Sequence, residues 1–193
     1  MNRAAEMAYR LLLRHGDGHL PVDPLAMLRK CRDVAVFTQD EAAQALGIAP
    51  PLDDNAQAIT WPIPRDGRLY RVVCYRTDGN PARLRFTLAH ELGHIALRHT
   101  EASPRAEREA DTFASHLLMP RPVIDCLKER GPLYAEQVCS LCFVSLSAAR
   151  LLSDERPLYM EESLRDQVEA LFFDGLPLLL PGGQITPRWH RIR

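Results

Sequence analysis

The pentapeptide His90-Glu91-Leu92-Gly93-His94 limits the structure of its surroundings more than any other part of the chain. In a helix each residue advances about 100°, so His90 and His94 lie about 40° apart around the axis and one turn apart along it. Both imidazoles can then hold one metal ion, with Glu91 beside them as a general base for metal-bound water. The segment therefore predicts a helix that binds zinc, with manganese as the alternative metal. A helix with two solvated histidines is the other interpretation.

Two strands are expected before this helix, and mostly helices after it. The runs 58–61 and 69–75 are rich in β-branched and aromatic residues and predict an antiparallel hairpin. Caps, prolines and apolar periodicity predict a short strand at 34–37 and helices at 2–14, 25–31, 40–46, 84–98, 104–119, 122–128, 134–142, 145–152 and 160–173. The predicted fold class is α+β, with a small antiparallel sheet packed on a helical core and a C-terminal helical subdomain. We expect one domain at 1–130 and a region of short helices with a basic tail at 131–193.

Composition limits the partners of the chain. The 24 basic and 25 acidic residues nearly balance, so no long-range field draws the molecule to nucleic acid or to anionic lipid. The five cysteines are scattered, and the N-terminal stretch has only three consecutive leucines where a signal peptide needs about seven apolar residues. No run approaches the length of a membrane span. These features predict a soluble, reduced, cytoplasmic protein without membrane contact.

A catalytic zinc site usually has three protein ligands, so one more group is needed beside the two histidines. On a helix from Pro104, Glu107 falls on the stripe that carries Ala110, Ala114 and Leu118, which we expect to face the core. A carboxylate there is costly unless it is paired, and a metal ion is its strongest partner. Glu107 is therefore the expected third ligand; the alternative is an ion pair with an arginine such as Arg85 or Arg108.

Two further acidic residues lie on the same helix. Asp111, one turn after Glu107, can accept the free N–H of His90 or His94 and fix the ring tautomer. Glu109 falls on the opposite face, together with His116, and both are expected to face solvent. His99 would point away from the metal if the preceding helix continued, so it is interpreted as a packing or helix-end histidine.

These residues resemble a known family. The stretches Arg85-Phe86-Thr87-Leu88-Ala89 before the pentapeptide, Glu107-Arg108-Glu109-Ala110-Asp111-Thr112-Phe113-Ala114 and Leu117-Leu118-Met119-Pro120 are similar to those of the ImmA/IrrE zinc metallopeptidases. The resemblance spans roughly residues 3–152 and implies a gluzincin-like core. It implies that His90, His94 and Glu107 are the metal ligands and that Glu91 is the base. Many relatives have asparagine at the position of Asp111, and many carry a DNA-binding domain for which we expect no room before Asn2.

The resemblance also implies a function. Members of the family cleave a helix-turn-helix repressor and so switch on stress-response or mobile-element genes. We accordingly predict a zinc-dependent endopeptidase that acts on a protein partner of this kind. The alternative is a non-proteolytic, metal-binding regulatory or toxin-antitoxin module that acts by association, and a third is a zinc hydrolase of small substrates.

Several weaker signals remain open. Gly93 either admits a strand or substrate to the metal face or relieves helix packing. Donors for a developing oxyanion are not ranked by the sequence; the candidates are Tyr70, Tyr75, His99 and His116. Cys139 and Cys142 are interpreted as buried free thiols rather than half of a zinc site. The region 134–152 could form a helix-turn-helix, but Arg150 is its only basic residue, which argues against DNA binding. The basic ending 188–193 is interpreted as a solvated tail.

Overall fold

The computed structural model describes residues 2–47, 52, 57–154 and 160–173. The chain divides into two compact units, which are labelled unit 1 (Met1–Val22 and Ser115–Arg193) and unit 2 (Asp23–Ala114). Each unit is described by itself below. The domain boundary expected at residue 130 stays a prediction, and the basic ending 188–193 lies outside the described residues.

Unit 2 is built on a three-stranded sheet with the order β1-β3-β2. The strands are β1 (Val34–Thr38), β2 (Ala58–Arg65) and β3 (Arg68–Tyr75). β2 and β3 form the expected antiparallel hairpin, and β1 pairs with β3 in parallel. Pro62 and Pro64 lie in β2, which is an edge strand among the described residues, a position where a missing N–H donor is tolerated. The central strand β3 is more deeply buried in its second half than in its first. Val73 and Cys74, in that second half, are fully buried.

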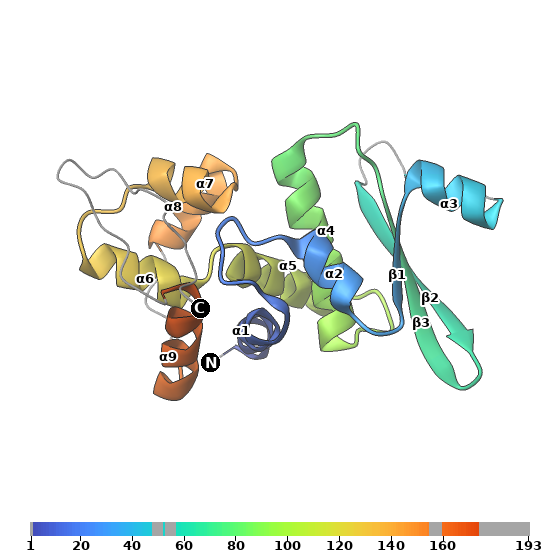
Figure 1. The fold of residues 1–193 in the computed structure, drawn as a ribbon, viewed down its shortest axis with the longest axis horizontal. Helices are drawn as coiled ribbons and strands as arrows, with labels where there is room; N and C mark the ends of the chain where they lie inside the picture. The colour runs from blue at the N-terminus through green and yellow to red at the C-terminus, as the bar shows by residue number, and fades with distance from the viewer. Residues whose placement is uncertain (1, 48–51, 53–56, 155–159, 174–193) are drawn as a thin grey trace. The chain divides into compact units, whose positions relative to one another are not determined.

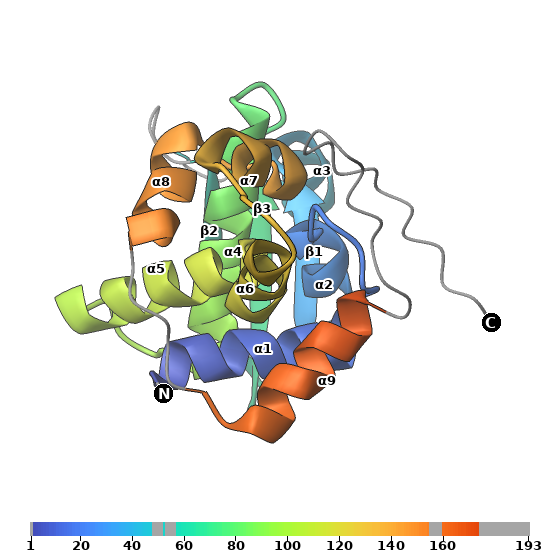
Figure 2. The same cartoon turned by 90° about the vertical axis from the view of Figure 1, so that its left-hand side faces the viewer.

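Helices cover both sides of this sheet. Helices α2 (Pro24–Lys30) and α4 (Pro81–Leu97) lie on one side of the strands, and α3 (Gln39–Leu46) lies on the other (Figure 1 and Figure 2). Asn80 caps α4 by accepting hydrogen bonds from the N–H groups of Ala82 and Arg83, and Pro81 occupies its first turn. The first part of α5 (Pro104–Leu118) completes unit 2. Its core includes Leu28, Val73, Leu88, Leu92, Ala110 and Phe113.

Unit 1 is helical in its described part. It contains α1 (Arg3–His15), the end of α5, α6 (Arg121–Glu129), α7 (Ala135–Cys142), α8 (Leu146–Asp154) and α9 (Glu162–Phe172). Helices α1 and α9 lie side by side (Figure 2), and α7 packs on α8. The core includes Tyr9, Leu12, Leu117, Ile124, Leu127, Val138, Val168 and Phe172.

Two polar residues of unit 1, His116 and Arg121, are buried and have hydrogen-bond partners. The Tyr9 hydroxyl lies 2.7 Å from Nδ1 of His116. Arg121 Nη1 donates to the carbonyl oxygen of Leu152 at 2.6 Å, and its Nε donates to Asp125 at 3.0 Å. The solvent-facing position expected of His116 was therefore wrong, because the Tyr9 hydroxyl supplies the hydrogen-bond partner that allows the imidazole to be buried.

The α+β fold class is confirmed, and the structure adds one feature to the expected antiparallel sheet. β1 joins it in parallel, because the chain crosses from β1 through α3 to β2 before it returns in β3. Within the described ranges no single helix has the length and apolar content of a membrane span. The segments Ala135–Cys142 and Leu146–Leu152 reach them only when taken together, and they are bent by 117°.

Candidate metal centre

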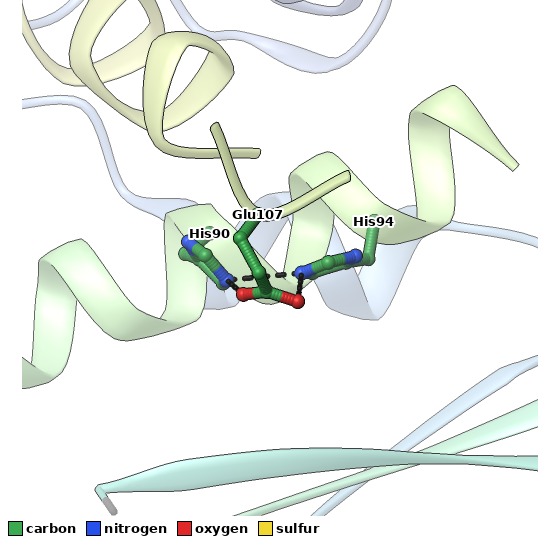
Figure 3. A group of neighbouring side chains, drawn as sticks. All are labelled: His90, His94 and Glu107. Atoms are coloured by element: carbon green, nitrogen blue, oxygen red, sulfur yellow. Dashed lines mark hydrogen bonds and ion pairs between the residues drawn. The ribbon is translucent and has the colours of Figure 1, made fainter. Parts of the chain in front are cut away.

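Two helices of unit 2 bring His90, His94 and Glu107 together (Figure 3). His90 and His94 project from successive turns of α4, and Glu107 projects toward them from the first turn of α5. The two Nε2 atoms are 2.9 Å apart. Glu107 Oε2 lies 3.2 Å from Nε2 of His90, and Oε1 lies 3.6 Å from Nε2 of His94. Among the residues that the structure describes, this is the one group of three with metal-ligand geometry.

The spacing of these atoms fits a tetrahedral cation. Bonds of about 2.0–2.1 Å from zinc to nitrogen or oxygen place neighbouring ligand atoms about 3.3 Å apart. The three separations in the cluster, from 2.9 to 3.6 Å, fall on both sides of that value. Two imidazole nitrogens and one carboxylate are also a usual donor set for zinc with one position left for water. The residues therefore fit a single divalent cation of zinc size.

The outer nitrogen of His90 is held by a carboxylate. Asp111 Oδ1 lies 2.9 Å from Nδ1 of His90. An ionised carboxylate can only accept, so the His90 ring carries its proton on Nδ1 and its Nε2 lone pair faces Glu107. This is one of the two contacts expected of Asp111, and its role as a partner of a metal ligand stays a prediction.

Glu91 lies on α4 next to the first histidine, and its side chain is partly buried. Burial raises the pKa of the Glu91 carboxyl; the nearby Thr60 hydroxyl and His90 oppose that rise, and the charge of Glu107 adds to it. Thr60 Oγ1 is buried, and its geometry toward Glu91 is poor for a hydrogen bond. Thr60 therefore lowers the pKa of Glu91 by less than burial raises it. The result is a carboxylate that holds a proton more readily than one in water.

The burial expected of Glu107 was wrong. Its side chain is 51% exposed, whereas those of His90 and His94 are 17% and 20% exposed. The buried stripe of α5 is centred about 60° from Glu107 and consists of Ala106, Ala110, Phe113, Ala114, Leu117 and Leu118. Glu107 therefore lies at the edge of that stripe, and the cluster opens to solvent on its side. The argument from a buried carboxylate fails, although the contacts with both histidines are present.

His99 and Glu109 also lie differently from what the helical wheel predicted. Helix α4 ends at Leu97, and Arg98 adopts a left-handed conformation with φ of 60°. The chain turns there, so His99 packs against His94 with its Nδ1 3.0 Å from Nδ1 of His94. Glu109 Oε2 lies 3.1 Å from Nε2 of His99, and its side chain is only 23% exposed. No glycine marks this turn, so it could not be predicted from the residues around Arg98.

Gly93 serves the packing of α4 on α5. A Cβ atom at this position would lie 3.0 Å from Cδ1 of Phe113 and 3.2 Å from Cα of Ala110. Those contacts are tighter than side chains usually make, and they come from a neighbouring helix of the same unit. Of the two interpretations of Gly93, relief of helix packing is the one that the structure supports.

The remaining candidate residues lie outside the cluster. Tyr75 is buried in β3, and Tyr70 has the guanidinium of Arg68 5.7 Å from its ring centre. All five cysteines are free; Cys142 is buried and Cys139 is partly exposed. Arg150 forms an ion pair with Glu136 at 3.6 Å. None of these contacts identifies a donor for an oxyanion.

Comparison with known families assigns the chain. The sequence profile of the IrrE N-terminal-like domain, a family of peptidases, matches residues 63–170, which is more than half of the chain. The chain belongs to this family, and the ImmA/IrrE resemblance is confirmed. Family membership and the His90, His94 and Glu107 cluster together support a metallopeptidase-type role. A comparison with curated proteins gives no match.

Proposed function

We propose that this chain is a zinc-dependent endopeptidase that cleaves a protein partner. The observation that carries the proposal is the convergence of three ligand atoms from His90, His94 and Glu107, with Glu91 next to His90 on α4. We further propose, from the family resemblance alone, that the partner is a helix-turn-helix repressor whose loss switches on stress-response or mobile-element genes. A cytoplasmic location belongs to the same proposal.

The ligands have distinct tasks in this proposal. His90 and His94 bind through Nε2, and Glu107 binds through a carboxylate oxygen from the next helix. When bound, zinc lowers the pKa of a coordinated water from about 15.7 to near 7 and polarises the scissile carbonyl. The half-exposed side of Glu107 leaves that face of the cluster open to an extended peptide.

Glu91 is the proposed general base. Its carboxylate accepts the proton of the attacking water and later donates it to the amine that leaves. A raised pKa suits this double task, because a carboxyl that holds its proton too weakly cannot protonate an amine. Glu91 is not one of the three residues of the cluster, so removal of its carboxylate should abolish turnover and leave metal binding in place.

A peptidase assay tests the enzyme directly. Zinc-loaded wild type, Glu91→Gln and the control Glu101→Gln, an exposed acid outside the cluster, are incubated with a proteome-derived peptide mixture. New peptide ends are counted by mass spectrometry. We expect cleavage by wild type and by Glu101→Gln, with a loss of at least about 100-fold in Glu91→Gln. Equal cleavage by Glu91→Gln would overturn the proposed role of Glu91.

The protein partner requires a separate assay. A helix-turn-helix repressor encoded next to this chain is incubated with the same three proteins, and its fragments are followed by electrophoresis. We expect wild type and Glu101→Gln to cleave it and Glu91→Gln to leave it intact. Stable association without cleavage by any of the three would favour the regulatory module over the peptidase.

The metal is tested by content and affinity. Purified wild type and His90→Ala are dialysed against zinc and against manganese, and the bound metal is measured by atomic emission. We expect one zinc per wild-type chain and a loss of at least about tenfold in affinity in His90→Ala. An affinity of His90→Ala for zinc equal to that of wild type would rule out the proposed ligand set.

A further inference from the structure

A chain of polar contacts runs outward from His94 to the surface. Nδ1 of His94 lies 3.0 Å from Nδ1 of His99, and Nε2 of His99 lies 3.1 Å from Oε2 of Glu109. Arg105 Nε donates to the other carboxylate oxygen of Glu109 at 2.8 Å. Of the four residues in this series of contacts, His99 has the least exposed side chain, at 13%.

The hydrogen bonds of this series determine which ring nitrogens of His94 and His99 carry a proton. Arg105 Nε donates to Glu109, and a carboxylate paired with a guanidinium in this way can only accept hydrogen bonds. In its neutral form, His99 donates from Nε2 to Glu109 and has a lone pair on Nδ1. That lone pair accepts the proton of His94 Nδ1. The lone pair of His94 Nε2 is therefore directed at Glu107, 3.6 Å away.

We propose that His99 and Glu109 are positioning residues for the metal, which fix His94 in the tautomer and orientation that binds through Nε2. The inference rests on the proposed metal centre. His90 is oriented directly by the carboxylate of Asp111, whereas His94 is oriented by a carboxylate that acts through a second imidazole. Two acids of α5 thus serve the two histidines of α4, at positions 109 and 111.

The ring geometry agrees with a hydrogen bond rather than simple packing. The His94 and His99 rings are 5.0 Å apart between centres and are inclined at 75°, so one ring meets the other through its edge. The two atoms in contact at these edges are the Nδ1 nitrogens of His94 and His99. The left-handed turn at Arg98 is what brings His99 back to this place.

Zinc affinity measured by competition with a chromophoric chelator tests the proposal. The variants are His99→Leu, which removes the acceptor, and His99→Asn, whose amide oxygen can replace Nδ1. His19→Leu, at an exposed histidine of unit 1, is the control. We expect zinc affinity to fall about 10- to 100-fold in His99→Leu and to stay close to the wild-type value in His99→Asn and His19→Leu.

Glu109 allows a double-mutant test that separates positioning from folding. Glu109→Ala should weaken zinc binding in the wild-type background, because His99 is then free to adopt the other tautomer. The same substitution should have little effect in the His99→Asn background, where no ring tautomer has to be fixed. An equal loss in both backgrounds would mean that Glu109 acts through its pairing with Arg105, and the proposal would be overturned.

Nitrogen NMR of the metal-free protein at pH 8 gives a readout besides binding. Long-range proton–nitrogen spectra should show His94 protonated on Nδ1 in wild type and a mixture of tautomers in His99→Leu. Tight zinc binding by both wild type and His99→Leu, with one tautomer in each, overturns this proposal and leaves the metal centre intact. Failure of wild type to bind zinc overturns the metal centre and this proposal together.

Discussion

Replacement of the buried His116 should make the stability of the chain less dependent on pH. His116 is 8% exposed, and burial, together with the charge of Arg121, lowers the pKa of its imidazole from 6.5 to about 4. The unfolded chain therefore binds a proton between these values that the folded chain does not. Its contribution is fully present above pH 6.5 and is lost as the pH falls toward 4, by about 3 kcal/mol in total.

Urea unfolding of wild type, His116→Gln and His19→Gln at pH 7 and pH 5 measures this effect. From the folded pKa of about 4, His116 should account for a loss of about 2 kcal/mol between the two pH values. His116→Gln has a different stability at pH 7, because the contact with the Tyr9 hydroxyl changes, but it should lack that part of the pH dependence. His19→Gln, at an exposed site, should retain it. The same pH dependence in wild type and His116→Gln would refute the reasoning.

Three further outcomes are expected. Gly93→Ala should lower the free energy of unfolding by about 1 kcal/mol, because its Cβ meets Phe113 at 3.0 Å; a higher melting temperature would contradict this. Arg121→Ala should lower it by about 3 kcal/mol in urea titrations, since it leaves Asp125 and the carbonyl of Leu152 without their charged donor, and a change below about 0.5 kcal/mol would contradict it. Zinc at 100 times its wild-type dissociation constant should raise the stability of wild type by up to about 2.7 kcal/mol in the same titrations and that of His90→Ala by at least about 1 kcal/mol less; equal responses would argue against the site.

Local rules predicted most of the helices and strands. Asp23 and Ser103, each followed by a proline, mark the starts of α2 and α5, and their side chains make the expected capping bonds. The same signature at Asn80 and Pro81 starts α4 three residues before the predicted position. The parallel pairing of β1 with β3 was not predictable in this way, because it joins segments far apart in the chain and leaves no periodic signal in either.

In the candidate site, too, local spacing was predictable from the sequence and tertiary packing was not. Helical spacing alone places His90 and His94 on one face, and the distance of 2.9 Å between their Nε2 atoms agrees with it. Which residues at the edge of the buried face of α5 are enclosed depends on what packs against it: Ala110, Ala114 and Leu118 are buried as predicted, whereas Glu107, about 60° from the centre of that face, is not. The position of His99 depends on the left-handed backbone conformation of one residue, Arg98. Residues other than glycine seldom adopt this conformation, so it could not be predicted from the sequence.

His90, His94, Glu107 and Asp111 come from one short stretch of the chain, because His90 and Asp111 are only 21 positions apart. Closing so short a loop costs little entropy, so the same ligands can meet around a cation while the sheet is unfolded. A cation that also binds the denatured chain stabilises the native state by less than its native affinity implies. The stabilisation by zinc should therefore fall short of the value calculated from native affinity alone.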